Sequence, residues 1–156
     1  MCTRGRFTLV LLVLAWSALA AAKDIALISH KANHVDEISL PELIKICKGQ
    51  TNRWPDGKPV TFVTRDPASP DAKLVLQKIY EMSKEDAAAL IANANHSRVN
   101  HPAIVVAASD EALVKKVEST PGAVGLVDVY AITGGVTVVH VGGKLPLEPG
   151  YPLHGN

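Results

Sequence analysis

Cysteine and aromatic residues are scarce in this chain, and its charges nearly cancel. The sequence has only two cysteines and 4% aromatic residues, and 16 basic side chains stand against 15 acidic ones. Cys2 lies in a segment that we expect to be removed, so Cys47 has no partner for an intramolecular disulfide, and we interpret it as a buried, inert thiol. Balanced charge and few aromatic rings argue against nucleic-acid binding, which needs a clustered basic surface or base-stacking rings.

The chain also lacks an apolar run long enough to cross a bilayer, which takes about 20 residues. Its amino-terminal apolar run, Phe7 to Leu14, follows two arginines and precedes the small residues Ala18 to Ala22. This order is typical of a secretory signal peptide. We therefore expect cleavage near Ala22, a signal peptide at residues 1–22, one domain at residues 23–156, and a periplasmic or secreted protein. A retained membrane anchor is the alternative.

Arrangements typical of enzymes and metal sites are not evident either. No glycine-rich phosphate loop, nucleophile elbow or pair of catalytic carboxylates stands out, so we expect a non-enzymatic protein without a cofactor. His30 and His34 form one spaced pair, and His96 and His101 form another. Because a zinc site needs three or four ligands in a defined geometry, we interpret these histidines as solvated loop residues and expect no metal site. Asn95 begins a formal glycosylation sequon.

The chain does contain a regular alternation of strand-like and helix-like segments. Helices are predicted to begin after Ser39, Ser69, Ser83 and Ser109, with Ser39 and Glu42 forming a capping box. Strands are predicted at residues 25–29, 59–64, 104–107, 123–130 and 136–141, and the tail from residue 142 is predicted to be irregular. The alternation predicts an α/β fold in which helices flank a sheet.

Arg65 ends the second predicted strand, and Ser69, the predicted cap of the next helix, follows four residues later. A helix start offers unpaired amides, and an arginine offers charge and a two-pronged set of donors. Because open α/β sheets bind ligands at the carboxyl ends of their strands, we predict an anion site at Arg65 and Ser69. Ser29, at the end of the first strand, could add a hydroxyl group at the same edge. The alternative is local pairing of Arg65 with Asp66 or Asp71.

Four ordered motifs resemble the phosphate-binding proteins of phosphate ABC transporters. They are the run from Ile46 to Gly57 followed by Arg65, the run Pro121 to Val127, the run Val141 to Pro146, and the run Gly150 to Leu153. The resemblance spans about Asp24 to Leu153. It implies a type II periplasmic-binding-protein-like fold with a mixed sheet flanked by helices. It also implies that Arg65 belongs to a phosphate site, as the corresponding arginine does in that family.

Two departures from the family pattern limit what the resemblance implies. The turn after Arg65 is Asp66-Pro67-Ala68-Ser69-Pro70, without the family's Ser-Gly-Thr, and its two prolines remove backbone donors. The mature chain also has the length of one lobe, whereas family members close two lobes on the ligand. A single lobe cannot enclose its ligand, so we expect weak binding.

Our leading hypothesis is a non-enzymatic solute-binding-like protein that recognises phosphate or a similar oxyanion in association with ABC-type transport. Its partner would be an ABC transporter or a sensor component of the membrane. The alternative hypothesis is an interaction module, in which the same lobe presents the carboxyl ends of its strands to a partner protein or forms a dimer. Light scattering and binding measurements would separate the two.

Overall fold

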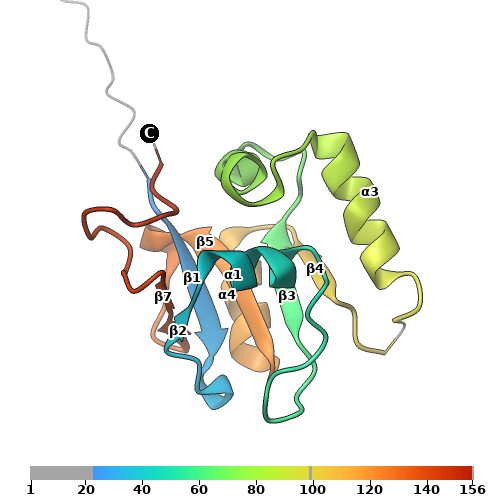
Figure 1. Cartoon of the computed structure of the whole chain (residues 1–156), viewed down its shortest axis with the longest axis horizontal. Helices are drawn as coiled ribbons and strands as arrows, with labels where there is room; N and C mark the ends of the chain where they lie inside the picture. Colours follow the sequence, from blue (N-terminus) through green and yellow to red (C-terminus); the bar gives the residue numbers. More distant parts are fainter. Residues whose placement is uncertain (1–22, 99, 156) are drawn as a thin grey trace, which may run out of the picture.

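A mixed β-sheet with helices on both faces forms the centre of the structure (Figure 1). The computed structural model describes residues 23–98 and 100–155. Within these residues five strands lie in the order β4-β3-β5-β1-β6, and β2 and β7 form a separate parallel pair. The strands are β1 (Ile25–His30), β2 (Glu37–Ile38), β3 (Thr61–Arg65), β4 (Ile104–Ala107), β5 (Ala123–Asp128), β6 (Val136–Val138) and β7 (His140–Val141). The predicted fold class is confirmed.

Strand direction decides which residues meet at each edge of the sheet. β3 pairs in parallel with β4 and with β5, so Arg65 and Asp128 end at the same edge. β1 runs antiparallel to β5, with Ile25 opposite Asp128 and Ser29 opposite Val124. We call the edge where β3, β4 and β5 end the carboxyl edge, and the opposite one the amino edge. The carboxyl edge lies at the top of Figure 1.

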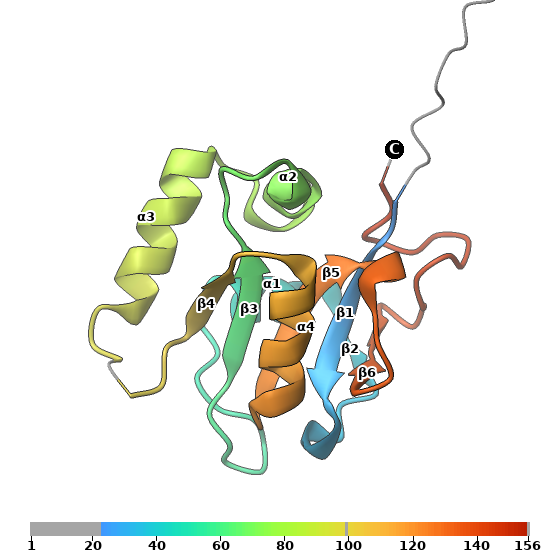
Figure 2. The same ribbon diagram turned by 180° about the vertical axis from the view of Figure 1, so that it is seen from behind.

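Helices cover the two faces of the sheet unequally. The face seen in Figure 1 carries α1 (Leu40–Cys47) and a helical segment at residues 70–80, with α3 (Lys84–Asn95) beside it. Figure 2 shows α4 (Asp110–Ser119) crossing the other face. The 70–80 segment changes its hydrogen bonding along its length, from a 3-10 turn at Pro70–Ala72 (η2) through α2 (Lys73–Val75) to a π-helical turn at Leu76–Tyr80 (η3). Two further 3-10 turns are η1 (Lys31–Asn33) and η4 (Val129–Ala131).

Polar caps place three of the helix starts where the sequence predicts them. The Ser39 hydroxyl accepts the amide of Glu42, and the Glu42 carboxylate accepts the amide of Ser39 at 3.1 Å, which completes the capping box. Ser83 and Ser109 cap α3 and α4 in the same way, each accepting one backbone N–H. Gly49, with a φ of 69°, ends the turn after α1, where a left-handed conformation favours glycine. These local predictions are confirmed.

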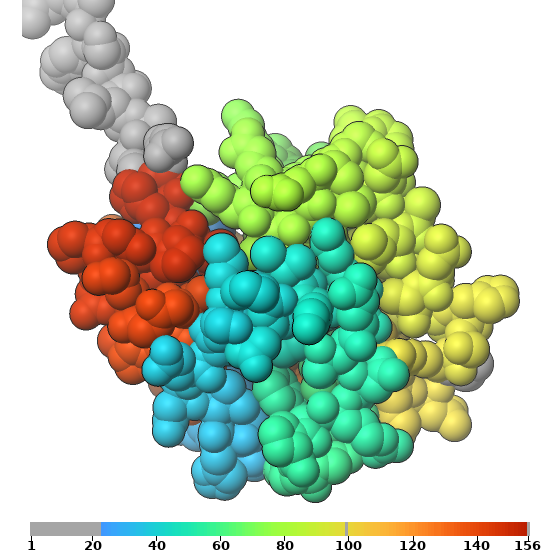
Figure 3. Space-filling view, viewed as in Figure 1, coloured from blue at the N-terminus to red at the C-terminus, as the bar shows by residue number. Residues whose placement is uncertain are grey.

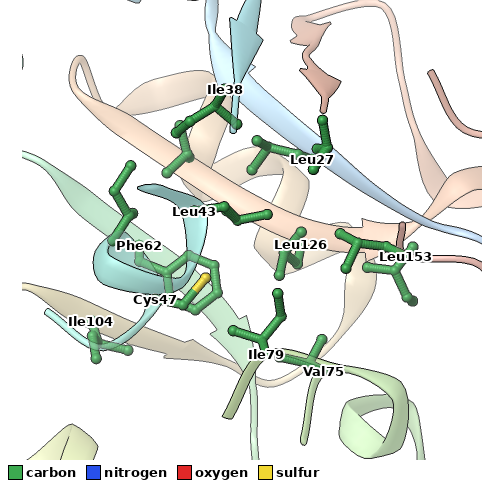
Figure 4. Close-up of a cluster of buried hydrophobic side chains, with 14 of the residues drawn as sticks. Leu27, Ile38, Leu43, Cys47, Phe62, Val75, Ile79, Ile104, Leu126 and Leu153 are labelled. Carbon is green, nitrogen blue, oxygen red and sulfur yellow. The ribbon is translucent and has the colours of Figure 1, made fainter. Parts of the chain in front are cut away.

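The sheet separates two hydrophobic cores. The larger core packs α1 and the 70–80 segment onto one face, and Figure 4 shows side chains from distant elements meeting there. Its fully buried members include Leu43, Phe62 and Ile79. Cys47 has no exposed surface, and burial raises the pKa of its thiol well above the usual range. The thiol is therefore the inert core residue that the sequence predicts. The smaller core packs α4 onto the other face through Leu113 and Val117.

The carboxyl-terminal tail, which was predicted to be irregular, packs tightly against the first strand. Tyr151 donates its hydroxyl hydrogen to the carbonyl of Ile25 at 2.7 Å, and the Ile25 amide donates to the carbonyl of Leu153 at 3.1 Å. The tail has little regular secondary structure, yet Tyr151 and Leu153 are core residues. Figure 3 shows the tail, coloured red, at the left side of the molecule next to the segment of α1.

The predicted signal peptide, residues 1–22, lies outside the described residues. In the part of the chain that the structure does describe, none of the helices combines the length and the apolar character that a bilayer crossing requires.

Candidate functional site

Arg65 lies at the carboxyl edge, between the starts of two helices. Its Nη1 lies 2.6 Å from an oxygen of Asp110, and its Nη2 lies 3.1 Å from an oxygen of Asp71. Asp71 stands in the first turn of the 70–80 segment, and Asp110 stands in the first turn of α4. Carboxylates are favoured at the positive amino-terminal ends of helices. The chain therefore supplies acidic partners of its own to the arginine that was predicted to bind an anion.

Two polar atoms at this site have no partner. Ser69 occupies the N-cap position of the 70–80 segment, but its side chain accepts no capping hydrogen bond. The Oγ of Ser69 and the Nε of Arg65 are both buried without a hydrogen-bond partner, and no other side-chain atom of the described residues combines these properties. Buried polar atoms are nearly always paired, so each exception needs an explanation. Both exceptions fall on residues that the sequence predicts to bind an anion.

The loop between these residues offers few backbone donors. The amide of Ala68 donates to the carboxylate of Asp66 at 2.8 Å, and the amide of Ser69 donates to the carbonyl of Asp66, also at 2.8 Å. Pro67 and Pro70 have no N–H group. A ligand at this loop would therefore depend on the Ser69 hydroxyl, on the Arg65 guanidinium and on neighbouring side chains.

A groove of about 640 Å³ runs along the carboxyl edge beside Arg65. Its residues come from the 70–80 segment, from the adjacent ends of β1 and β5, and from Gly155 near the carboxyl terminus. Figure 1 shows this segment and the chain end on either side of the edge. The charged lining consists of four basic residues and three acidic residues: Lys23, Arg65, Lys73, Lys78, Asp71, Asp110 and Asp128. The groove is thus only slightly basic in net charge. We call it the carboxyl groove.

Ser29 does not join this site. Because β1 is antiparallel to β5, the carboxyl end of β1 lies at the amino edge, and the expectation that Ser29 shares an edge with Arg65 was wrong. The Ser29 side chain is buried, accepts a hydrogen bond from the Nδ2 of Asn33 at 2.9 Å, and donates to the carbonyl of His30 at 3.3 Å. Its hydroxyl group therefore holds the turn after β1.

Asp110 is the residue of this site that sequence reasoning missed. It follows β4 just as Asp71 follows β3, because each strand leads through a serine into a helix with an aspartate in its first turn. Parallel neighbouring strands bring such helix starts to one edge. If β3 and β4 had been expected to be parallel neighbours, the residues that follow them would have been placed at one edge, and Asp110 would have been suggested as a partner of Arg65.

His30 and the asparagine of the sequon have local structural roles. The Nδ1 of His30 accepts the amide of Ala32 at 3.0 Å. The side-chain amide of Asn95 donates to the carbonyl of Ile104 at 2.7 Å and accepts its N–H at 3.1 Å, so the nitrogen of the sequon is engaged in the fold. No group of three or more His, Cys, Asp or Glu side chains within residues 23–98 and 100–155 is arranged to hold a metal ion.

Known proteins resemble this chain over most of its length. The family model of the PBP superfamily domain matches residues 14–148. An ABC-type phosphate transport receptor from Vibrio cholerae superposes with a TM-score of 0.69 at 18% identity, covering 86% of this chain and 54% of that protein. PstS from Borrelia burgdorferi superposes with a TM-score of 0.65 at 16% identity, covering 86% of this chain and 55% of that protein.

A third structure contains a ligand. It is a putative phosphate ABC transporter substrate-binding protein from Clostridium perfringens with bound phosphate, with a TM-score of 0.60, 21% identity, and coverage of 78% of this chain and 46% of that protein. At such identities the likeness shows a shared fold. The chain spans about half the length of these proteins. No curated protein matches its sequence.

Proposed function

The chain belongs to the PBP superfamily domain family, and we propose that it is a non-enzymatic solute-binding protein that recognises phosphate or a similar oxyanion. Arg65 and Ser69 would form the centre of the site. The observation that carries this proposal is the pair of unpartnered buried atoms, the Nε of Arg65 and the Oγ of Ser69. A tetrahedral oxyanion has oxygens on every side, so it could accept a hydrogen from each of them. A charge-assisted bond of this kind is worth about 1.5–3 kcal/mol.

The neighbouring carboxylates make this a weak site. Asp71 and Asp110 already neutralise Arg65, and a phosphate would have to approach them. The Asp71 side chain is 57% exposed against 25% for Asp110, so Asp71 is the partner that a ligand would displace more easily. With few backbone donors and two competing carboxylates, we expect a dissociation constant on the order of 1 mM, which corresponds to about 4 kcal/mol of binding free energy.

Transport outside the cytoplasm is the setting that we propose for this binding. The similar structures are described as a phosphate transport receptor and a phosphate ABC transporter substrate-binding protein. Residues 1–22 have the pattern of a signal peptide, so we propose cleavage near Ala22 and a periplasmic or secreted mature protein. Its membrane partner would be a component of an ABC transporter or a sensor.

A titration followed by nuclear magnetic resonance tests the binding site. Every described helix and strand lies after residue 22, so a chain of residues 23–156 contains the fold. We expect phosphate and sulfate to shift the amide signals of Arg65 and Ser69. Replacing Arg65→Ala should weaken binding at this position by about tenfold or more. Lys115→Ala, which removes one exposed positive charge from α4, is the matched control.

The site assignment would be wrong if millimolar anions shifted no amide signal near Arg65. It would also be wrong if Arg65→Ala and Lys115→Ala weakened binding there to the same extent, because the effect would then come from net charge alone. Comparison of the melting temperatures of both variants with that of the parent separates loss of binding from loss of fold.

A second candidate function is that of an interaction module, and two exposed apolar side chains favour it. Tyr130 is 74% exposed and Leu147 is 63% exposed. The amide of Tyr130 donates to Asp128, and the amide of Leu147 donates to Asp24, so both residues border the carboxyl edge. Exposed aromatic and apolar side chains often anchor protein interfaces. A partner protein or a second copy could therefore cover the open side of the carboxyl groove.

Light scattering tests this second function. If the chain dimerises through the carboxyl edge, the parent protein should show twice the monomer mass, and the variant Tyr130→Ser with Leu147→Ser should return to the monomer. A parent protein that stays monomeric at millimolar concentration would exclude the dimer, and a search for a membrane partner with the same double variant as control would follow.

A further inference from the structure

Arginines line a second groove, at the edge of the sheet opposite the proposed phosphate site. The groove has a volume of about 480 Å³ and lies between the loop that precedes β3 and the loop that follows α3. Its polar lining includes Asn52, Arg53, Arg98 and His101. Figure 1 places the loop before β3 at the lower end of the molecule and the loop after α3 at its right side, below α3, and Figure 3 shows their surfaces meeting at the lower right. We call it the arginine groove.

Neutral groups alone hold the two arginines. The Nη1 of Arg53 donates to the carbonyl of Gly57 at 2.8 Å, and the Nη2 of Arg98 donates to the side-chain oxygen of Asn52. No carboxylate lines the groove, and within the described residues neither arginine forms an ion pair. A guanidinium carries five N–H donors, so each arginine has donors beyond the one used in these hydrogen bonds. Arg53 also lines a neighbouring pocket, whose acidic residues are Asp36, Glu37 and Glu42.

The loop that carries Arg53 is fixed by the core. Trp54 is buried, and its indole N–H donates to the carbonyl of Gly122 at 2.8 Å. Arg53 itself pairs with Pro59 in an isolated antiparallel bridge, and the amide of Val60 donates to the carbonyl of Asn52 at 3.1 Å. The backbone at Arg53 is therefore positioned before any ligand arrives, which lowers the entropic cost of binding.

The loop that carries Arg98 is fixed at both of its ends. Asn95 binds the backbone of Ile104 through two hydrogen bonds of 2.7 and 3.1 Å, which joins the end of α3 to the start of β4. The amide of Arg98 donates to the carbonyl of Asn95 at 3.0 Å. These contacts thus bring two arginines, which lie 45 positions apart in the sequence (98 − 53), to the lining of one groove.

We propose that the arginine groove binds the phosphate-type oxyanion of a small molecule or of a lipid headgroup, independently of Arg65. Planar guanidinium groups bind phosphate oxygens with paired N–H donors, and two of them around one group suit a dianion. His101, which also lines the groove, adds an imidazole N–H donor. In the described part of the chain, no carboxylate lines this groove, whereas three line the carboxyl groove. The shared ligand chemistry is the phosphoryl group.

The test titrates residues 23–156 with inorganic phosphate and with pyrophosphate, and follows the amide signals of both grooves separately. We expect shifts at Arg53 and Arg98, and at least about tenfold weaker binding there in the double variant Arg53→Gln with Arg98→Gln. The variant Arg65→Ala should leave these shifts unchanged. A double variant with Lys115→Gln and Lys116→Gln on α4 loses the same charge elsewhere and is the matched control.

A second arm distinguishes the source of the phosphoryl group. Vesicles of phosphatidylglycerol and vesicles of phosphatidylcholine are mixed with the protein and floated through a density gradient. Binding to phosphatidylglycerol alone, lost in the Arg53→Gln and Arg98→Gln variant, supports a headgroup ligand. Binding of free phosphate without flotation supports a soluble ligand. The variant Arg53→Lys with Arg98→Lys keeps the charge but loses the paired donors, and should bind severalfold more weakly than the parent.

Three outcomes would overturn the proposal. The first is the absence of both flotation and amide shifts at these arginines when either anion is present at about 10 mM. This concentration is far above the dissociation constant expected of a functional site. The second is an equal weakening of phosphate binding in the Lys115→Gln and Lys116→Gln control variant, because binding would then depend on net charge alone. The third is binding of a polyglutamate peptide without binding of any phosphoryl probe, which would assign the groove to an acidic protein partner. If the Arg53→Gln and Arg98→Gln variant unfolds, the proposal is tested by comparing the Arg53→Lys and Arg98→Lys variant with the parent.

Discussion

The two edges of this sheet carry arginines in opposite surroundings. At the carboxyl edge, Arg65 is paired with Asp71 and Asp110. At the amino edge, the side chains of Arg53 and Arg98 donate, within residues 23–98 and 100–155, to a backbone carbonyl and to an amide oxygen. An arginine at the expected place of a fold is therefore a weaker guide to anion binding than the acids that the fold gathers around it. The family resemblance directs attention to the first edge, whereas the charge balance favours the second.

The direction of the helices explains part of this difference. α4 and the 70–80 segment both begin at the carboxyl edge, and the positive ends of helices favour aspartate in the first turn. α3 and α4 end at the amino edge, where the negative ends of helices favour cations such as Arg98. Each effect is worth about 0.3–1 kcal/mol, so both edges are stabilised by charges of opposite sign. At the amino edge an anion can bind the arginines without displacing a carboxylate, whereas at the carboxyl edge it must first displace one.

The largest effect that we predict concerns the scaffold of the amino edge. Gly122 has a φ of 88°, and a Cβ added there would lie 2.0 Å from the carbonyl oxygen of Pro59. Gly122 also accepts the indole N–H of Trp54 and donates its amide to Asn33 at 2.7 Å. We expect Gly122→Ala to lower the free energy of unfolding by about 3 kcal/mol or more, through the clash and the strained backbone.

Urea unfolding measures this change. Gly134→Ala is the matched control, because a Cβ at Gly134 meets no atom within 4 Å. Equal stability of the two variants would show that the Gly122 turn does not hold the arginine groove. In folded Gly122→Ala protein, the amide shift that phosphate causes at Arg53 should be reduced more than the shift at Arg65.

The next effect compares the partners of the arginines. Removing one of the two acidic partners of Arg65 by Asp110→Ala should cost about 1–3 kcal/mol, because the guanidinium side chain is only 15% exposed and loses a charged partner. Removing the neutral partner of Arg98 by Asn52→Ala should cost about 0.5 kcal/mol or less, since Asn52 is exposed. Urea midpoints of both variants give the comparison. A larger loss of stability in Asn52→Ala than in Asp110→Ala would contradict the prediction that the carboxyl edge holds its arginine more strongly.

Local features of the fold were predictable from the sequence because they depend on residues close together in the chain. Ser39 and Glu42 meet within one helical turn, and Gly49 supplies the conformation that ends it. The segment at residues 70–80 shows the limit of such reasoning. Ser69 stands at its start as predicted, but the expected capping hydrogen bond is not formed, and its hydroxyl group is left without a partner.

Features that depend on strand direction and on long-range pairing were not predictable from any single segment of the sequence. Ser29 was placed at the edge of Arg65 because the end of the first strand was expected to lie at that edge, and the antiparallel β1 puts it at the other end. Asp110 reaches Arg65 across 45 positions (110 − 65) only because β3 and β4 are neighbours. The arginine groove likewise arises from two separate loops. No pattern within a single segment contains these contacts.

A smaller predicted effect concerns ligand affinity at the carboxyl edge. Asp71 is the more exposed partner of Arg65, and its charge opposes an incoming anion. Two unit charges about 4 Å apart in water interact by about 1 kcal/mol, so Asp71→Asn should tighten phosphate binding at Arg65 by about fivefold. Binding at Arg53 and Arg98 should not change. Amide titration of the parent and the variant checks both statements, and unchanged affinity at Arg65 would mean that Asp71 does not face the ligand.

The smallest effect concerns the turn that supports Arg53. Lys58 donates hydrogen bonds from its side chain and from its backbone to Asp56, and these bonds lower the pKa of the Asp56 carboxyl. A carboxyl whose pKa is lower in the folded state contributes stability above its unfolded pKa of about 4, and loses it as the pH falls through the folded value. Asp56→Asn should therefore be slightly less stable than the parent at pH 7, with no difference at pH 2.

Because Asp56 is exposed, salt should shrink this difference, and its size should be near the limit of measurement by urea unfolding. The matched variant is Glu42→Gln, whose carboxyl has a pKa lowered by hydrogen bonds with Ser39 in the capping box of α1. It should show the same dependence on pH without altering the arginine groove. If Asp56→Asn alone weakens phosphate shifts at Arg53, the turn positions the guanidinium; if neither variant does, the buried Trp54 is sufficient to hold the loop.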